Sequence, residues 1–209
     1  MARRKSKKKA IIARNREQLF PGALCFAWLK RNTNMSSKQG LQDITRQMAT
    51  YLNQIDPADY RQPLDVLSGS SIGQHFRHIF DFYHCLAKGA AEDLVDYANR
   101  ERDPRVESDP VFAARVLGDT MDQIAQLPED QLIRMRADFM HLGETDRPLY
   151  PSSYGRELTF VHDHAVHHLA LIKIGFQAQC PGLLTDPNFG VAPSTVRFRE
   201  EQNAETVQS

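Results

Sequence analysis

Four of the eight histidines of this chain lie between residues 162 and 168. His164 and His168 are four positions apart in an apolar segment, and residues at that spacing lie one turn apart on the same face of a helix. Two imidazoles placed in this way can bind one divalent metal ion. On a helical wheel, His167 falls about 80° from their shared line and His162 about 140° from it, toward solvent. The spacing therefore selects His164 and His168 as the pair that faces the interior.

Inward-facing histidines also have a simpler explanation. A buried imidazole without a hydrogen-bond partner costs about 1–3 kcal/mol, so a single inward histidine is normally hydrogen bonded within the core. Two on one line are harder to explain in this way, and a metal ion would satisfy both. A complete site needs a third ligand from another helix, and the segment 71–88 offers His75, His78 and His84. The residues alone leave metal binding and core hydrogen bonding open.

Amphipathic segments supply the elements that would position these residues. Apolar residues recur at three- and four-residue steps over 38–55, 71–88, 109–127 and 153–176. This periodicity predicts four helices. Ser71 with Gln74 forms a capping-box pattern, and Gly89 is expected to end the second helix. Alternating residues over 131–150 predict a small hairpin. We therefore predict an all-α four-helix bundle with a short β-hairpin between its third and fourth helices.

The ends of the chain differ from this central part. Residues 1–31 hold ten Lys or Arg against one acid, Glu17. We expect residues 1–34 to be a disordered or mis-assigned N-terminal extension, because the segment from Met35 onward reads like a natural start that leads into a helix. The alternative is a nucleic-acid-binding or targeting tail. The bundle is expected to span residues 35–180, and a polar C-terminal tail residues 181–209.

Composition excludes several classes of protein. With 209 residues, 41% hydrophobic and 25% charged, the chain has the make-up of a soluble globular protein. It contains no apolar run near the ~20 residues of a membrane span. Beyond residue 31 the chain holds 16 basic and 25 acidic residues, so the folded body lacks a basic surface for nucleic acid. The scattered cysteines Cys25, Cys85 and Cys180 favour a reducing cytoplasm, and Cys85 is expected to be a buried structural thiol.

Two segments resemble the DinB-like superfamily of four-helix-bundle proteins. Residues 70–79 are similar to its second-helix signature, in which a serine at the helix start precedes a ligand histidine by eight positions. Residues 156–172 are similar to its fourth-helix signature, in which an aliphatic residue, here Ile172, follows a His-x-x-x-His pair by four positions. The resemblance covers roughly residues 35–176. It implies the bundle fold and a metal site whose ligands are His78, His164 and His168.

The resemblance also implies a chemistry. Three neutral imidazoles leave a metal ion its full charge and an open coordination position, unlike a closed structural site with four protein ligands. The superfamily implies a metal-dependent transferase or hydrolase that acts on a small molecule, with a low-molecular-weight thiol as cosubstrate. Zinc or nickel is the expected divalent ion, and iron is a further candidate. A non-catalytic metal- or ligand-binding bundle, such as a stress-associated binding module, and a purely structural role stay open, and no catalytic residue is assigned.

Residues around the site have expected roles of their own. Each ligand imidazole should donate its other N–H to a carboxylate or carbonyl, and the candidates near in sequence are Asp81, Glu157 and Asp163. The helical wheel turns Asp163 toward the surface. An anionic substrate could be bound by the loop arginines Arg100, Arg102 and Arg105, although loop arginines are more often solvated. A bundle of this size is also compatible with a homodimer.

Overall fold

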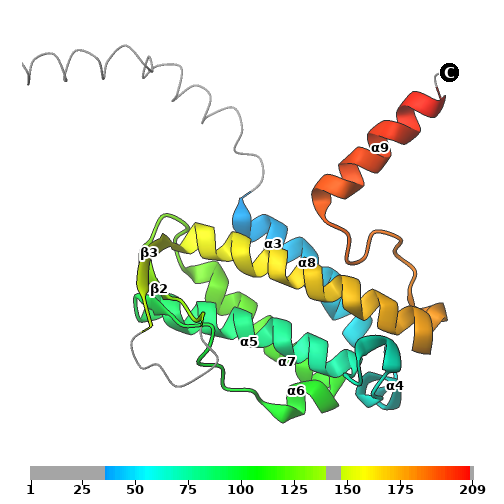
Figure 1. Cartoon of the computed structure of the whole chain (residues 1–209), viewed down its shortest axis with the longest axis horizontal. Coiled ribbons are helices and arrows are strands. Elements are labelled where there is room, and N and C mark those ends of the chain that lie inside the picture. Colours follow the sequence, from blue (N-terminus) through cyan, green and yellow to red (C-terminus); the bar gives the residue numbers. More distant parts are fainter. Residues whose placement is uncertain (1–35, 140–146, 208–209) are drawn as a thin grey trace, which may run out of the picture. The chain divides into compact units, whose positions relative to one another are not determined.

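The computed structural model of the chain describes residues 36–139 and 147–207 (Figure 1). Residues 1–34, which we predicted to be an extension, lie outside the described residues. The described part is mostly helical and carries one small three-stranded sheet. None of its helices is both long enough and apolar enough to cross a membrane.

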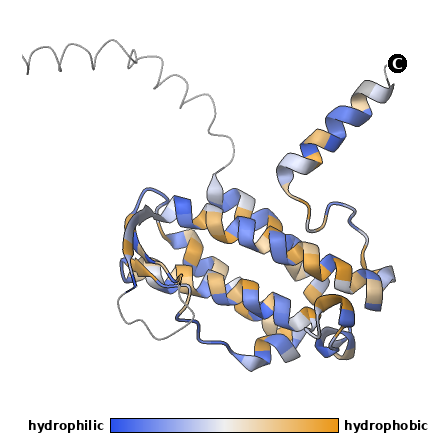
Figure 2. Ribbon diagram, viewed as in Figure 1, coloured by the Kyte–Doolittle hydropathy of each residue, from blue (hydrophilic) through white to orange (hydrophobic). Residues whose placement is uncertain are grey.

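Four long helices build the body: α3 (Ser37–Leu52), α5 (Ile72–Ala91), α7 (Pro110–Gln126) and α8 (Tyr154–Gln179). Helices α3 and α5 each pack against both α7 and α8, so the four enclose one hydrophobic core (Figure 1). Hydrophobic and hydrophilic residues alternate around each helix, as Figure 2 shows, which lets one face of each helix contribute to that core. The four predicted amphipathic segments thus form helices at the predicted places.

Side-chain caps fix where these helices begin. At the start of α5 the Ser71 hydroxyl accepts a hydrogen bond from the backbone N–H of Gln74 at 3.1 Å, and the Gln74 side chain accepts one from the N–H of Ser71 at 3.1 Å. This confirms the predicted capping box. Asp109 caps α7, in which Pro110 occupies the first position, and Ser153 caps α8. Polar residues just before each apolar run therefore set the helix starts.

Gly89 does not end α5, and that prediction was wrong. The helix continues to Ala91. A Cβ atom at position 89 would lie 2.6 Å from the carbonyl oxygen of Leu94 and 2.7 Å from the Cα of Val95. These two residues form strand β1 (Leu94–Val95), whose backbone passes directly over the helix. Glycine is needed here because the two backbones approach closely, not because the helix stops.

The sheet confirms the predicted hairpin and corrects the all-α prediction. Strands β2 (Leu132–Arg136) and β3 (Leu149–Ser153) pair antiparallel, with Leu132 opposite Ser153. Residues 140–146 of their connection lie outside the described residues. Strand β1 pairs parallel to β2, which makes a mixed sheet in the order β1-β2-β3. A strand of two residues is too short to leave a periodicity in the sequence, so β1 was not predicted.

Short helices occupy the connections between the long ones. The connection between α3 and α5 contains α4 (Pro57–Arg61) and the 3₁₀ helix η1 (Asp65–Leu67). The polar stretch 90–109 contains α6 (Pro104–Ser108). Beyond α8 lie the 3₁₀ helix η2 (Pro181–Leu183) and α9 (Pro193–Val207).

The segment after residue 180 is not only a polar tail. Phe189 is fully buried, and its ring centroid lies 4.4 Å from that of Tyr51 and 5.7 Å from that of Phe176. The backbone N–H of Asp186 also donates to the Tyr51 hydroxyl at 3.2 Å. The hydrophobic core therefore includes part of the segment that we assigned to the tail.

Candidate metal centre

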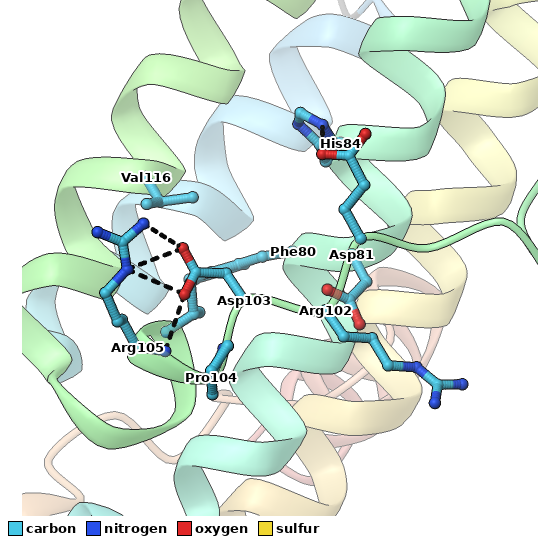
Figure 3. A pocket seen from close by; sticks show the side chains of 10 residues that line it. Phe80, Asp81, His84, Arg102, Asp103, Pro104, Arg105 and Val116 are labelled. Atoms are coloured by element: carbon cyan, nitrogen blue, oxygen red, sulfur yellow. Dashed lines mark hydrogen bonds and ion pairs between the residues drawn. The ribbon is translucent and has the colours of Figure 1, made fainter.

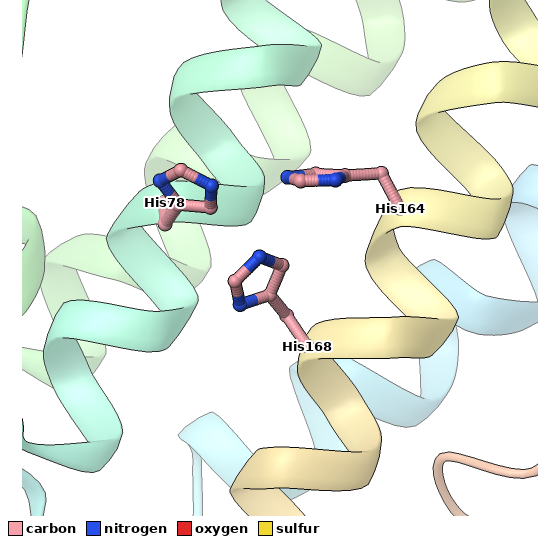
Figure 4. Close-up of side chains that lie close together, drawn as sticks. All are labelled: His78, His164 and His168. Atoms are coloured by element: carbon pink, nitrogen blue, oxygen red, sulfur yellow. The ribbon is translucent and has the colours of Figure 1, made fainter. Parts of the chain in front are cut away.

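Helices α5 and α8 bring three histidines together. His78 comes from α5, and His164 and His168 come from α8; Figure 4 shows their rings pointing toward one another. One ring nitrogen from each residue lies within 4.8 Å of the other two. The ring centroid of His168 lies 4.4 Å from that of His78 and 4.6 Å from that of His164. These three residues, called the histidine cluster below, are the three that the sequence singled out.

The cluster lies beside the core face of α8. The residues of α8 that are completely buried are Tyr154, Glu157, Leu158, Val161, Ala165, Leu169, Ile172 and Phe176. His164 and His168 lie one position before Ala165 and Leu169, so their rings are only half-buried. The face of α8 that points into the core is therefore centred one residue later than the helical wheel predicted. This shift leaves the rings partly accessible, as a site that meets a substrate requires.

The other two histidines of the segment lie outside the cluster. His167 is exposed, in agreement with the wheel. The His162 side chain is only 19% exposed, less than predicted, and its Nδ1 lies 3.3 Å from a carboxylate oxygen of Asp163. Neither residue belongs to the group whose nitrogens converge.

His75 contacts the cluster without being part of it. Its Nδ1 lies 3.1 Å from the Nδ1 of His168, so one of the two rings donates a hydrogen bond to the other. That bond occupies Nδ1 of His168 and leaves its Nε2 as the nitrogen available to a metal. The third candidate, His84, is 43% exposed and lies 3.7 Å from Glu101. Of the three candidates on α5, His78 therefore belongs to the cluster, His75 contacts it and His84 lies at the surface.

Burial keeps the cluster uncharged at neutral pH. Desolvation lowers the pKa of His78 and of His164 to about 4, and that of His168 to about 3. The neighbouring imidazoles lower these pKa values further, because two adjacent rings cannot easily carry charge together. Neutral imidazole is the form that binds a metal ion.

One atom of the cluster lacks a partner. The Nε2 of His164 is buried and makes no hydrogen bond to any described residue. Buried polar atoms are nearly always paired, so this one calls for a partner that the described part of the chain does not supply. Three imidazole nitrogens are a donor set that zinc, nickel and iron accept. The residues present therefore fit a divalent metal ion.

Aromatic side chains form one wall of the cluster. The ring of Phe82 stacks on that of His164, with centroids 4.0 Å apart, and Tyr97 stacks on Phe82 at 5.1 Å. The Tyr97 hydroxyl donates to the carboxylate of Glu157 at 2.9 Å. Glu157 is completely buried and also accepts from the Ser152 hydroxyl at 2.6 Å. Glu157 thus holds the wall in place, two side chains away from the nearest cluster histidine.

The three carboxylates that we expected to orient the ligand rings have other partners. Asp81 accepts from Arg77 at 2.7 Å, Asp163 is exposed beside His162, and Glu157 binds Tyr97. Among the described residues, no hydrogen bond joins any of them to the cluster. For His168, the ring is oriented instead by His75, which lies three residues before His78 on α5.

A separate cavity of about 400 Å³ lies on another side of α5 (Figure 3). Its lining includes Phe80, Asp81, His84, Arg102, Asp103 and Arg105, but no cluster histidine. Its charges are largely paired: Arg105 binds Asp103 at 2.6 Å, and Asp81 binds Arg77. Of the three loop arginines, Arg102 and Arg105 belong to this cavity.

Cys85 is a buried thiol, as predicted. It is 7% exposed, and its S–H donates to the carbonyl oxygen of Asn99 at 3.7 Å. Burial raises its pKa to about 11, so the thiolate is scarce at neutral pH. Cys85 is therefore poorly suited to act as a nucleophile.

No protein-family model and no solved structure matches this chain. FK506-binding protein 5 of Rhizopus delemar is 30% identical to it over 115 residues, which cover 52% of this chain and 28% of that protein. The chain spans less than a third of the length of this relative. The similarity is too partial to assign the chain to a family.

Proposed function

We propose that this protein is a metal-dependent transferase or hydrolase of DinB-like type that acts on a small molecule, with a low-molecular-weight thiol as cosubstrate. The observation that carries the proposal is the convergence of His78, His164 and His168, with one nitrogen of each within 4.8 Å of the others. The unpaired Nε2 of His164 supports it. The rings are half-buried and come from two helices, as expected for a site that both holds an ion and admits a ligand.

The donor set favours a catalytic site over a structural one. The histidine cluster offers three protein ligands, whereas closed structural sites supply four. Zinc or nickel is the proposed ion, with iron as a further candidate. When bound, such an ion supplies a Lewis acid that lowers the pKa of a water or a thiol. The protein's own part is to keep the three rings neutral, to orient His168 through His75, and to shield one side with Phe82 and Tyr97.

The fold supports the same proposal. Helices α3, α5, α7 and α8 each contact two of the others, which is the arrangement of a four-helix bundle. We propose that they form a bundle of DinB-like type to which the three-stranded sheet is added. The cytoplasm is the proposed location, because the thiols of Cys85 and Cys180 are free.

The test begins with metal content. The full chain, purified without chelator or nickel resin, is analysed for bound metals, and about one equivalent of zinc, nickel or iron is expected. The metal-loaded and metal-free proteins are then each incubated with mercaptoethanol and an electrophilic aryl chloride, and loss of free thiol is followed.

Each outcome has a clear meaning. Faster loss of thiol with the metal-loaded protein supports a thiol-dependent transferase. Bound metal without any acceleration of this or of ester hydrolysis would favour a non-catalytic binding module. A protein that takes up no divalent metal at neutral pH would reject the proposal.

A further inference from the structure

Arg100 lies next to the histidine cluster. It belongs to the segment between β1 and α6. Its guanidinium carbon is 5.3 Å from the ring centroid of Phe82, and the same ring stacks on His164 at 4.0 Å. The positive charge of Arg100 also helps to lower the pKa values of His78 and His164, which agrees with this proximity. A guanidinium group therefore borders the cluster on its aromatic side.

Among the described residues, no carboxylate forms an ion pair with Arg100. Its Nε is buried and makes no hydrogen bond. Two other partly buried arginines are paired: Arg77 with Asp81 and Glu107, and Arg147 with Asp96. A buried N–H without an acceptor is costly and uncommon, so it marks a place where a ligand atom can accept a hydrogen bond. Arg100 is thus an unpaired donor at the edge of the cluster.

The cluster offers no negative charge to balance this arginine. Its three ligands are neutral imidazoles, so a bound divalent ion would keep both of its positive charges. The acid nearest in sequence on α5, Asp81, already binds Arg77. An ion and an unpaired guanidinium together make a strongly positive site, and such a site attracts anions.

We propose that Arg100 binds the carboxylate of a small anionic ligand whose thiol is held at the histidine cluster. This inference rests on the proposed metal site and specifies its ligand as a thiol that carries a carboxylate. The guanidinium group presents two parallel N–H donors that match the two oxygens of a carboxylate, which a hydroxyl or an amine cannot satisfy. The ring of Phe82 lies against the guanidinium group and limits its movement.

The test compares two thiols that differ in one group. The full chain is loaded with Co²⁺, whose visible absorbance changes when a thiolate binds, and is titrated with mercaptopropionate and with mercaptoethanol. We expect mercaptopropionate to bind roughly tenfold more tightly than mercaptoethanol, because its carboxylate can form one charge-assisted hydrogen-bonded pair with Arg100. In the Arg100→Gln protein this preference should disappear while the affinity for mercaptoethanol stays the same, which also shows that the variant is folded. Arg100→Lys should keep part of the preference.

Arg102→Gln is the matched control. Arg102 lies two residues further along the same segment but lines the separate cavity, so its replacement should leave the preference intact. Equal affinities of the wild-type protein for the two thiols, or a preference that survives Arg100→Gln, would overturn the role of Arg100 and leave the metal site standing. A protein that binds no Co²⁺ would overturn the metal site and this inference together.

Discussion

The histidine cluster and the separate cavity lie on the same helix, α5, and differ in how their polar groups are satisfied. At the cavity, Arg105 pairs with Asp103 and Asp81 pairs with Arg77. At the cluster, Nε2 of His164 and Nε of Arg100 are buried and have no hydrogen-bond partner within residues 36–139 and 147–207. Stable structure normally leaves few buried polar groups unpaired, so these two, which lie beside three neutral imidazoles, point to a ligand. The cavity has a volume of about 400 Å³, but the cluster is the better candidate for a site.

The two regions also differ in what holds them. The cluster is formed by side chains on two long helices, whose backbones are fixed by the shared core. The cavity is bordered by the short helix α6. Close backbone contact at Gly73 packs α6 against α5, and the hydrogen bond from the Tyr60 hydroxyl to the carbonyl oxygen of Val106 at 2.8 Å joins α6 to α4. Changes at the cluster should therefore affect metal binding, and changes near the cavity should affect folding stability.

The largest expected effect is loss of metal from the cluster. The metal content should fall from about one equivalent to near zero in His78→Ala, His164→Ala and His168→Ala, because two imidazoles rarely hold an ion that needs three protein ligands. His162→Ala is the matched control and should keep its metal, since His162 lies outside the converging group. His75→Ala should bind metal about 10–100-fold more weakly, as expected for a residue that orients a ligand.

Elemental analysis of the five purified variants and the wild-type protein checks this prediction. Equal metal content in all of them would reject the assignment of ligands. Loss of metal from His75→Ala together with full retention in His78→Ala would show that the ligand on α5 had been assigned one turn too late.

The second effect concerns stability near the cavity. A Cβ atom at position 73 would collide with the backbone carbonyl of Glu107 and would lie 2.8 Å from the ring of Tyr60. Gly73→Ala should therefore lower the free energy of unfolding by about 3 kcal/mol, because α6 must move. The same change at Gly118, which has open space around it, should raise that energy by about 0.5–1 kcal/mol.

Urea unfolding of both glycine variants measures these energies, and metal analysis accompanies it. We expect the folded Gly73→Ala protein to keep its metal. If it lost metal in proportion to its stability, the two regions of α5 would not be independent.

Much of the cluster could be predicted from the sequence, for a physical reason. The four-residue spacing of His164 and His168 fixes them on one helical face whatever surrounds the helix. The choice of His78 over His75 came from the resemblance of residues 70–79 to a known signature, since both residues lie close to His168 in the structure. Local periodicity places a residue on a helix but does not orient one helix against another.

The parts that were missed depend on contacts between distant segments. Gly89 looked like a helix end, but the need for glycine comes from strand β1, which passes over the helix and is only two residues long. The bond between His75 and His168 exists because α5 and α8 pack together. The ion pair between Arg77 and Asp81 could have been predicted from the sequence, because the two residues are four positions apart on one helix. That prediction would have removed Asp81 from the expected partners of the cluster.

A third prediction uses the pH dependence of the metal-free protein. The folded pKa values of His78, His164 and His168 lie at about 3 to 4, below the value near 6.5 of an unfolded chain. Between pH 6.5 and 4 the unfolded chain therefore binds protons that the folded protein does not. The free energy of unfolding of the metal-free protein should be highest above pH 6.5 and should decrease as the pH is lowered from 6.5 to 4.

Urea unfolding of the metal-free protein at several pH values between about 7 and 4 tests this. The His168→Asn protein should show a shallower dependence, because one of the three depressed groups is gone. His167→Asn, which alters an exposed residue, serves as the control. Identical slopes in the wild-type and His168→Asn proteins would mean that the cluster histidines are not buried in their neutral form.

The smallest expected effect lies at the cavity surface. Arg105 is 70% exposed, and its partner Asp103 is only two residues away, so the pair gains little over two solvated charges and restricts two side chains. Arg105→Gln should leave the urea midpoint and the metal content unchanged within the error of each measurement. A clear loss of metal in this variant would show that the cavity is coupled to the cluster through α5. The presence or absence of hydrogen-bond partners would then no longer distinguish a structural region from a binding site.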